Sequence, residues 1–96
     1  MITALASIIV DSSRIPEVAQ EIAHIPGVET VYSVTGDVDL VAIVTVRRHE
    51  EFAGVIADRI GKVEGVLDTT TNIAFAAYSA RDLGEGFSLG EDPAAG

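Results

Sequence analysis

The residues best suited to hold a small ligand lie in one short segment, Thr35 to Asp39, which reads TGDVD. A glycine in a tight turn lets consecutive backbone N–H groups converge into a concave site for a carboxylate. Asp37 and Asp39 beside that turn would receive an ammonium group, so the segment offers both halves of an amino-acid site. The alternative is a plain hairpin turn at Gly36 and Asp37, followed by Asp39 as a polar strand start. The residue types alone favour this simpler interpretation.

Two threonines are a second candidate group for ligand contact. Thr69 and Thr71 are two positions apart in an apolar segment that is expected to be a strand. Side chains of a strand alternate between its faces, so both hydroxyls should lie on one side, where they would orient a small polar ligand. The alternative is that they are strand-favouring residues on a half-buried face.

Residues for catalysis or metal binding are few. His24 is expected on the surface at the end of the first helix, and His49 in the solvated loop before the second. Ser12 and Ser13 have no histidine partner in the pattern, and the chain has no cysteine. No close carboxylate cluster joins the histidines, so we expect no metal site, no cofactor and no catalytic residue. We therefore expect a protein that is not an enzyme.

The overall charge excludes two classes of partner. The chain has 96 residues, with six basic and fifteen acidic side chains and a net charge of −9. Nucleic-acid binding needs a basic surface, and an anionic membrane would repel this chain for the same reason. The apolar run Ile2–Val10 is too short to span a bilayer and has no positively charged leader. With no cysteine either, we expect a cytoplasmic protein.

An internal repeat predicts how the chain is organised. Residues 17–31 align with residues 55–69, so that Gly27 and Val28 fall on Gly65 and Val66. Each half has the pattern strand, helix, strand. The first helix is expected after Asp11 and Ser12, with Pro16 in its first turn, and residues 48–51 are expected to open the second helix, with acids in its first turn. The expected strands are Ile2–Val10, Val28–Thr35, Val38–Arg47 and about Leu67–Tyr78.

Two such units joined by a tight turn predict an α+β protein of the ferredoxin-like βαββαβ plan. It has a four-stranded antiparallel sheet with both helices on one face. The third strand is apolar on both sides, since Val41 and Ile43 alternate with Leu40, Ala42 and Val44. An antiparallel sheet open to water should instead alternate apolar and polar residues. We therefore expect a second copy of the chain to cover the uncovered face, giving at least a homodimer.

The chain divides into a folded domain, residues 1–80, and an acidic glycine-rich C-terminal tail, residues 81–96. The tail has four acids, one base and four glycines. A segment of this composition is expected to be disordered or loosely packed. The alternative is that Phe87 and Leu89 dock onto a partner subunit.

The run VYSVTGDVDLVAIV resembles the V-x-x-V-T-G-D-[FY]-D core of the C-terminal effector-binding (RAM) domain of the Lrp/AsnC, or feast/famine, transcriptional regulators. The stretches PGVETVYSVTG and GVLDTTTNIAF are similar to that domain too, and the resemblance covers about residues 1–79. One position departs from the pattern, since Val38 replaces the usual aromatic residue. The resemblance implies a dimeric α/β barrel that assembles further, up to octamers, with amino-acid effectors bound between dimers. The ligand-contacting positions it implies are Thr35, Gly36, Asp37, Asp39, Thr69 and Thr71.

Regulators of that family carry a helix-turn-helix domain before the effector domain, whereas Met1 here leads directly into the first expected strand. We therefore expect a stand-alone effector-sensing domain that oligomerises, from tetramer to octamer, binds an amino acid or a similar metabolite, and modulates full-length regulators. One alternative is a small dimeric α/β-barrel enzyme, of the cofactor-free monooxygenase or isomerase type. A third possibility is a scaffolding module without a ligand.

Overall fold

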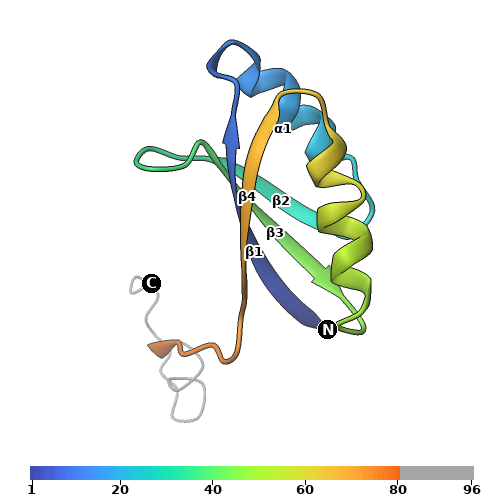
Figure 1. The fold of residues 1–96 in the computed structure, drawn as a ribbon. Helices are drawn as coiled ribbons and strands as arrows, with labels where there is room; N and C mark the ends of the chain where they lie inside the picture. The colour runs from blue at the N-terminus through green and yellow to red at the C-terminus, as the bar shows by residue number, and fades with distance from the viewer. Residues whose placement is uncertain (81–96) are drawn as a thin grey trace.

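The computed structural model describes residues 1–80, and the proposed tail of residues 81–96 lies outside the described residues. Four strands form one curved antiparallel sheet, and the helical segments cover one of its faces (Figure 1). The sheet order is β2-β3-β1-β4, which is the order expected of a βαββαβ chain. The predicted α+β ferredoxin-like fold is therefore confirmed. In chain order the elements are β1 (Ile2–Val10), η1 (Ser12–Arg14), α1 (Ile15–Ala23), β2 (Val28–Ser33), β3 (Leu40–Val46), η2 (Ala53–Ala57), η3 (Ile60–Lys62) and β4 (Val66–Ile73).

The first helical segment begins where the sequence predicts it. The Asp11 carboxylate accepts hydrogen bonds from the Ser13 backbone N–H, at 3.0 Å, and from the Ser13 hydroxyl, at 2.9 Å. This satisfies a donor that the start of a helix leaves free. Pro16 lies in the first turn of α1, where it costs no hydrogen bond. Val18 and Ile22 are buried against the sheet, so α1 holds one edge of the core.

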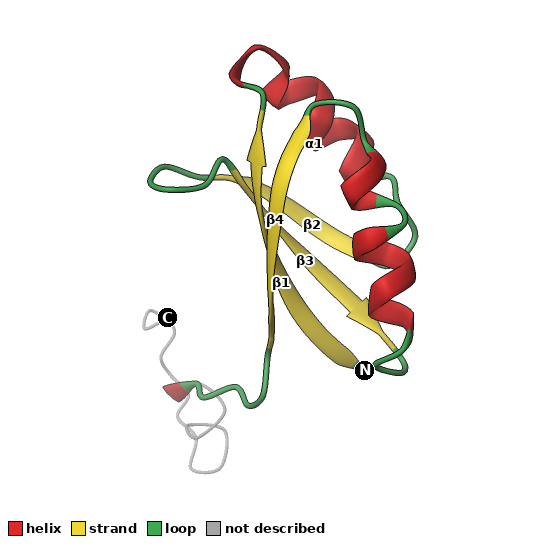
Figure 2. Cartoon of the chain, in the orientation of Figure 1, coloured by secondary structure: helices red, strands yellow, loops and turns green. Residues whose placement is uncertain are grey.

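The second helical segment is not the regular α-helix that the repeat predicts. One α-helical turn at Glu51 and Phe52 opens into the wide π turn η2, followed by the tight 3₁₀ turn η3. The Asp58 N–H donates to the Ala53 carbonyl, five residues back, at 3.1 Å. Gly54 and Gly61 give this segment low helix propensity, so packing decides its geometry. Phe52, Ile56 and Ile60 still form the buried stripe that was expected, and Figure 2 shows the segment lying over the sheet beside α1.

Three strands are shorter than the sequence predicts. β2 ends at Ser33 and β3 begins at Leu40, because the residues between them form a longer connecting loop. β4 ends at Ile73, about five residues early: Ile73 pairs with Ala4, the Ala74 N–H still donates to the Thr3 carbonyl at 2.8 Å, and the chain then turns away before it reaches Ile2. Residues 74–79, which we call the C-terminal arm, therefore leave the sheet, and the prediction of a strand there is wrong.

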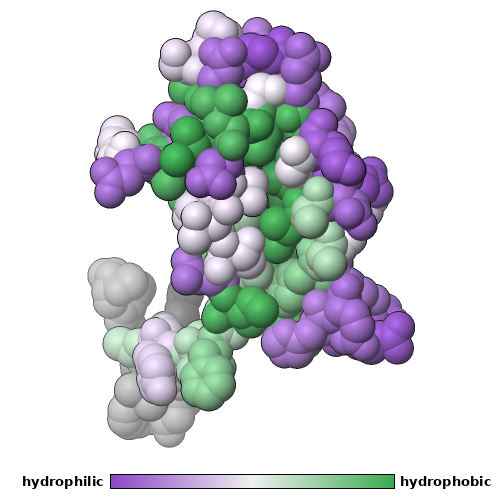
Figure 3. All heavy atoms as spheres, in the orientation of Figure 1, coloured by the Kyte–Doolittle hydropathy of each residue, from purple (hydrophilic) through white to green (hydrophobic). Residues whose placement is uncertain are grey.

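The two faces of the sheet differ as the alternation in β3 predicts. The helix-facing residues of β1 and β3 are apolar and, apart from the half-buried Ile2, all buried, and the alanines among them allow the helices to approach closely. The buried ones are Ala4, Ala6, Ile8, Val10, Leu40, Ala42, Val44 and Val46. The opposite face, which we call the open face, carries Leu5, Ile9, Tyr32, Val41 and Ile43, and none of the described elements covers it. Figure 3 shows hydrophobic residues reaching the surface over the sheet, whereas the outer side of the helices is largely hydrophilic.

Candidate functional site

The β2–β3 loop, residues 34–39, projects from the sheet on the side away from the helices (Figure 1). The Val34 N–H donates to the Asp39 carbonyl at 3.0 Å and closes the base of the loop. Gly36 has φ +113°, which an L side chain adopts only with strain, and a Cβ there would meet nothing within 4 Å. Thr35, Gly36 and Asp37 are all exposed. The tip of the loop is therefore open to a ligand or to another molecule.

Asp39 connects this loop to the C-terminal end of β1, an inner strand of the sheet. Its backbone N–H donates to the Ile8 carbonyl at 3.0 Å, and its Oδ2 accepts the Val10 N–H at 2.8 Å. The carboxylate thus satisfies a partly buried donor of β1, at the point where the ladder with β4 carries a bulge. One oxygen of Asp39 is committed to the fold, whereas the Asp37 carboxylate at the tip is exposed.

Thr69 and Thr71 lie on the other side of β1 from the loop. They pair with Ile8 and Ala6, and directly opposed residues of an antiparallel pair point to the same face. Both threonines are therefore on the helix side of β4, with Thr69 half-buried and Thr71 exposed at the sheet edge. β3 and β4 flank β1, so their backbones are about 10 Å apart. Within one copy, the loop and these threonines form two separate groups.

The open face carries a row of polar residues that the sequence did not single out. Asp68, Thr70 and Asn72 pair with Ile9, Ser7 and Leu5 and so face away from the helices. Together they form a polar border beside the apolar centre of that face. Residues 68–72 are all polar, so the sequence does not distinguish the two faces of β4, and only the register with β1 shows which residues face outward.

The two histidines have local roles and lie apart from the loop. His24 is exposed, and its Nδ1 is 2.8 Å from the Gln20 carbonyl. The ring of His49 meets that of Phe52 edge to face, with centroids 6.1 Å apart. Among residues 1–80, no group of three histidine, cysteine, aspartate or glutamate side chains is placed to hold a metal ion. Within the same residues, no helix has both the length and the apolar composition to cross a bilayer.

Within residues 1–80, two carboxyl groups have a lowered pKa, and both cap helical segments. The pKa of Asp11 is lowered by the hydrogen bonds from Ser13. The pKa of Glu51 is lowered by the backbone N–H groups of Arg47 and Arg48, which lie 2.9 and 3.3 Å from its Oε1. Hydrogen bonds to a carboxylate favour its charged form. These shifts therefore belong to the fold.

Comparison with known proteins identifies a family whose model matches most of this chain. The family model of the Lrp/AsnC ligand binding domain matches residues 3–83. The HTH-type transcriptional regulator LysM of Saccharolobus solfataricus is 41% identical over 63 residues, which are 66% of this chain and 44% of LysM. The chain spans about half the length, or less, of the curated relatives it matches.

Two solved structures extend the comparison. The TTHA0845 protein of Thermus thermophilus is 43% identical with a TM-score of 0.78, over 82% of this chain and 99% of that one. A feast or famine regulatory protein of M. tuberculosis, Rv3291c, solved with L-methionine, is 28% identical with a TM-score of 0.69, over 84% of this chain and 55% of that one. With the family match covering most of the chain, these findings show that the chain belongs to the Lrp/AsnC ligand-binding domain family.

Proposed function

We propose that this domain senses an amino acid at the β2–β3 loop and that the bound ligand favours one assembly state of the protein. The observation that carries the proposal is that the two loop aspartates have different surroundings. Asp39 anchors the loop through Val10, and Asp37 stays exposed beside the positive-φ turn at Gly36. Backbone N–H groups of such a turn suit a carboxylate, and the Asp37 carboxylate suits an ammonium group. An α-amino acid presents both groups.

The ligand class is supported by a relative. The M. tuberculosis regulator, which is 28% identical to this chain, was solved in complex with L-methionine. We extend the same class of ligand, a free amino acid, to this chain. Val38 beside Asp37 is half-buried and aliphatic, so the loop adds no aromatic wall to the site.

The site is proposed to be completed between copies of the chain. In one copy, Thr69 and Thr71 lie about two strand spacings, roughly 10 Å, from the loop and on the helix side of the sheet. A single amino acid cannot bridge these groups within one copy. If a second copy supplies one of the two groups, the ligand no longer has to span this distance. The predicted positions therefore act together only in an assembly; they are Thr35, Gly36, Asp37, Asp39, Thr69 and Thr71.

Assembly itself is proposed to begin at the open face. Leu5 and Ile9 on that face remain 38% and 36% exposed, and Tyr32 remains 55% exposed. Packing two such sheets face to face buries these side chains in the manner of a β-sandwich. We propose a homodimer of this kind, which assembles further to between a tetramer and an octamer.

The domain is proposed to act on regulators of its own family and not on DNA directly. Its net charge of −9 opposes contact with phosphates. The match covers 99% of the TTHA0845 chain, so that chain has the extent of this domain, which supports a role for the domain apart from a DNA-binding one. We propose that the present domain tunes full-length regulators by joining their effector domains through the same surfaces.

A binding role fits the interior better than the alternative of a small barrel enzyme. An enzyme of that type needs a polar pocket between sheet and helices. In residues 1–80 the buried residues are all apolar, and both tyrosines are exposed. The space between the sheet and the helices is therefore filled with apolar side chains.

The proposal is tested by melting the protein with each of the common amino acids at millimolar concentration. We expect at least one to raise the melting temperature, because a ligand bound only by the folded state stabilises it. Asp37→Asn should abolish that rise while melting normally without ligand. Glu21→Gln, which removes one charge from the exposed surface of α1, is the matched control and should keep it. If no amino acid changes the melting temperature, the sensing role is wrong.

A further inference from the structure

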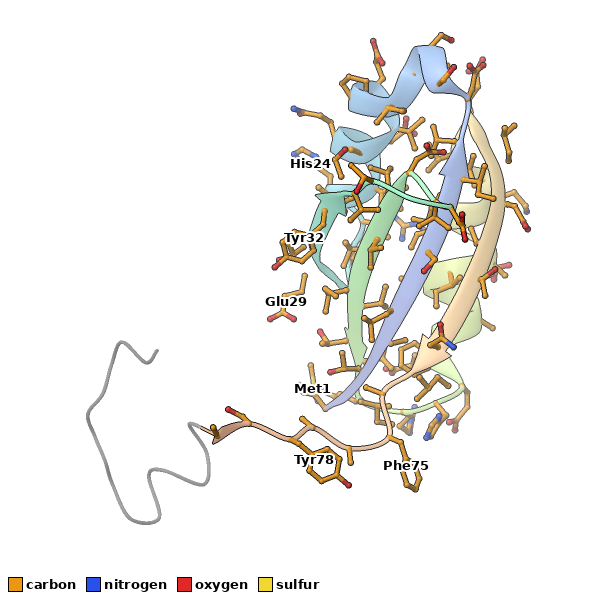
Figure 4. The ribbon with its side chains drawn as sticks, turned by 90° about the vertical axis from the view of Figure 1, so that its left-hand side faces the viewer. Met1, His24, Glu29, Tyr32, Phe75 and Tyr78 are labelled. Atoms are coloured by element: carbon orange, nitrogen blue, oxygen red, sulfur yellow. The ribbon has the colours of Figure 1, made fainter. Side chains whose placement is uncertain are left out.

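The C-terminal arm, residues 74–79, is a mostly apolar segment that carries two exposed aromatic rings. The Ala74 N–H donates to the Thr3 carbonyl at 2.8 Å, after which the chain leaves the ladder with β1. Phe75 is 101% and Tyr78 94% exposed, so both rings are outside the core. Figure 4 shows the two rings pointing away from the sheet. Three alanines accompany them.

Contact between the apolar side chains of the arm and water is energetically unfavourable. An aromatic side chain buries about 150 to 250 Å² when it is covered. In the arm, two aromatic side chains leave that area in contact with water. An extended backbone with apolar side chains is also a template for pairing with another chain. The arm therefore has the character of a docking element.

The direction of the arm indicates which molecule it meets. It bends toward the same side of the sheet as the β2–β3 loop, away from the helices (Figure 1). The open face is thus bordered by the loop at one end and by the arm at the other. A shallow hollow of about 520 Å³ lies between the arm and the start of β1, lined by residues that include Met1, Thr3, His49, Phe75 and Ala77. These features leave room for a second chain against the open face and beside the arm.

We propose that the arm is a clasp that crosses onto a second copy of this chain. When two open faces pack together, each arm lies along the partner's sheet, and Phe75 and Tyr78 become buried there. Six extended residues reach about 20 Å, whereas packed sheets are about 10 Å apart and a four-stranded sheet is about 19 Å wide. The arm is therefore long enough to cross the gap and run over the partner. This inference rests on the dimer of the proposed function and adds the exchanged segment to it.

The chain carries its own reporter for a test. It has no tryptophan and two tyrosines, so Tyr78 is the sole fluorescent tyrosine in a Tyr32→Phe variant. Acrylamide quenching of Tyr78 is measured over a protein dilution series in which sedimentation follows assembly. We expect the quenching constant to fall several-fold as the dimer forms, because the ring passes from water into the interface. Shielding that does not change with concentration would mean that the arm folds onto its own copy, which overturns the proposal.

A variant pair at Phe75 provides the second measurement. Phe75→Ser should raise the dissociation constant of the dimer by roughly tenfold or more, as expected for an aromatic anchor of an interface. Phe75→Leu, which keeps an apolar side chain, should raise it much less. Both variants should fold normally, because Phe75 is fully exposed within one copy. A dimer whose dissociation constant is unchanged in Phe75→Ser, with Tyr78 still accessible, overturns the clasp and leaves the proposed dimer and its ligand site standing. If the parent protein forms the dimer but no amino acid raises its melting temperature, the proposed sensing function is overturned and the clasp is not.

Discussion

Replacing the two loop aspartates one at a time should separate folding from binding. Asp39→Ala removes the acceptor of the 2.8 Å hydrogen bond from the Val10 N–H and leaves a partly buried donor without its partner. Hydrogen bonds to charged groups contribute about 1.5 to 3 kcal/mol, and an orphaned buried donor costs a similar amount. We therefore expect Asp39→Ala to lower the free energy of unfolding by about 2 kcal/mol. Asp37→Ala alters only an exposed side chain and should change it by less than about 0.5 kcal/mol.

Urea unfolding followed by far-ultraviolet circular dichroism measures this difference. With a slope of about 1 to 2 kcal/mol per molar urea, Asp39→Ala should lower the midpoint by about 1 to 2 M. Each variant is compared with the parent at the same protein concentration, because assembly adds to apparent stability. Asp39→Asn keeps a neutral acceptor for the Val10 N–H and should fall between the two alanine variants. If Asp39→Ala unfolds at the same midpoint as Asp37→Ala, the anchoring role of Asp39 is refuted.

Three further predictions concern the turns, the acid response and the open face. Gly65→Ala should lower the free energy of unfolding by roughly 1 to 3 kcal/mol in thermal melts, because Gly65 has φ +106° and a Cβ there would be 2.8 Å from Val18 Cγ2. Gly54→Ala, whose Cβ would meet nothing within 4 Å, should be neutral or stabilising, and an equal loss in both variants would contradict this account. Because the pKa of Glu51 is lowered in the folded state, its contribution to stability is present above its ordinary value of 4.5 and is lost as the pH falls through the lower pKa of the folded state. Glu51→Gln should therefore melt lower than the parent at pH 7 and converge with it as the pH is lowered into the acid range, and parallel melting curves at all pH values would argue against the cap. Ile43→Lys places a charge on the open face and should shift the protein toward monomer in sedimentation experiments, whereas an unchanged assembly would show that this face is not the interface.

The alternation of residues was enough to predict the layers of the fold. Leu40, Ala42 and Val44 are buried under the helices, and Val41 and Ile43 lie on the open face, as a period of two requires. β1 has the predicted bounds because its nine-residue segment has β-branched residues at both ends and stops at a turn that begins with Asp11. Local chemistry and tertiary packing agree in these elements.

Other features depend on partners that a single sequence does not reveal. β4 stops pairing with β1 at Ile73, opposite Ala4, and after one hydrogen bond from Ala74 to Thr3 the apolar residues 75–78 leave the ladder, although their composition is that of a strand. The wide turn η2 brings Phe52, Ile56 and Ile60 onto the core in spite of two glycines, which propensity alone does not foresee. Register likewise decides that Thr70, and not Thr69 or Thr71, faces the open side.

The candidate site shows the same limit. The TGDVD segment was recognisable as a loop able to hold a ligand. The hydrogen bond between Asp39 and Val10 spans 29 positions in sequence, and no spacing rule could have identified it. The assignment of Thr35, Gly36, Asp37, Asp39, Thr69 and Thr71 as ligand contacts remains a prediction for the experiments proposed above.

The mass of the particle in solution at low micromolar concentration decides whether the open face is covered by a second copy of the chain. The apolar centre of the open face, with Leu5 and Ile9 more than a third exposed, predicts a species of at least twice the mass of the chain. Sedimentation equilibrium should find that species and no substantial monomer. A protein that remains a stable, well-folded monomer at that concentration would contradict the account.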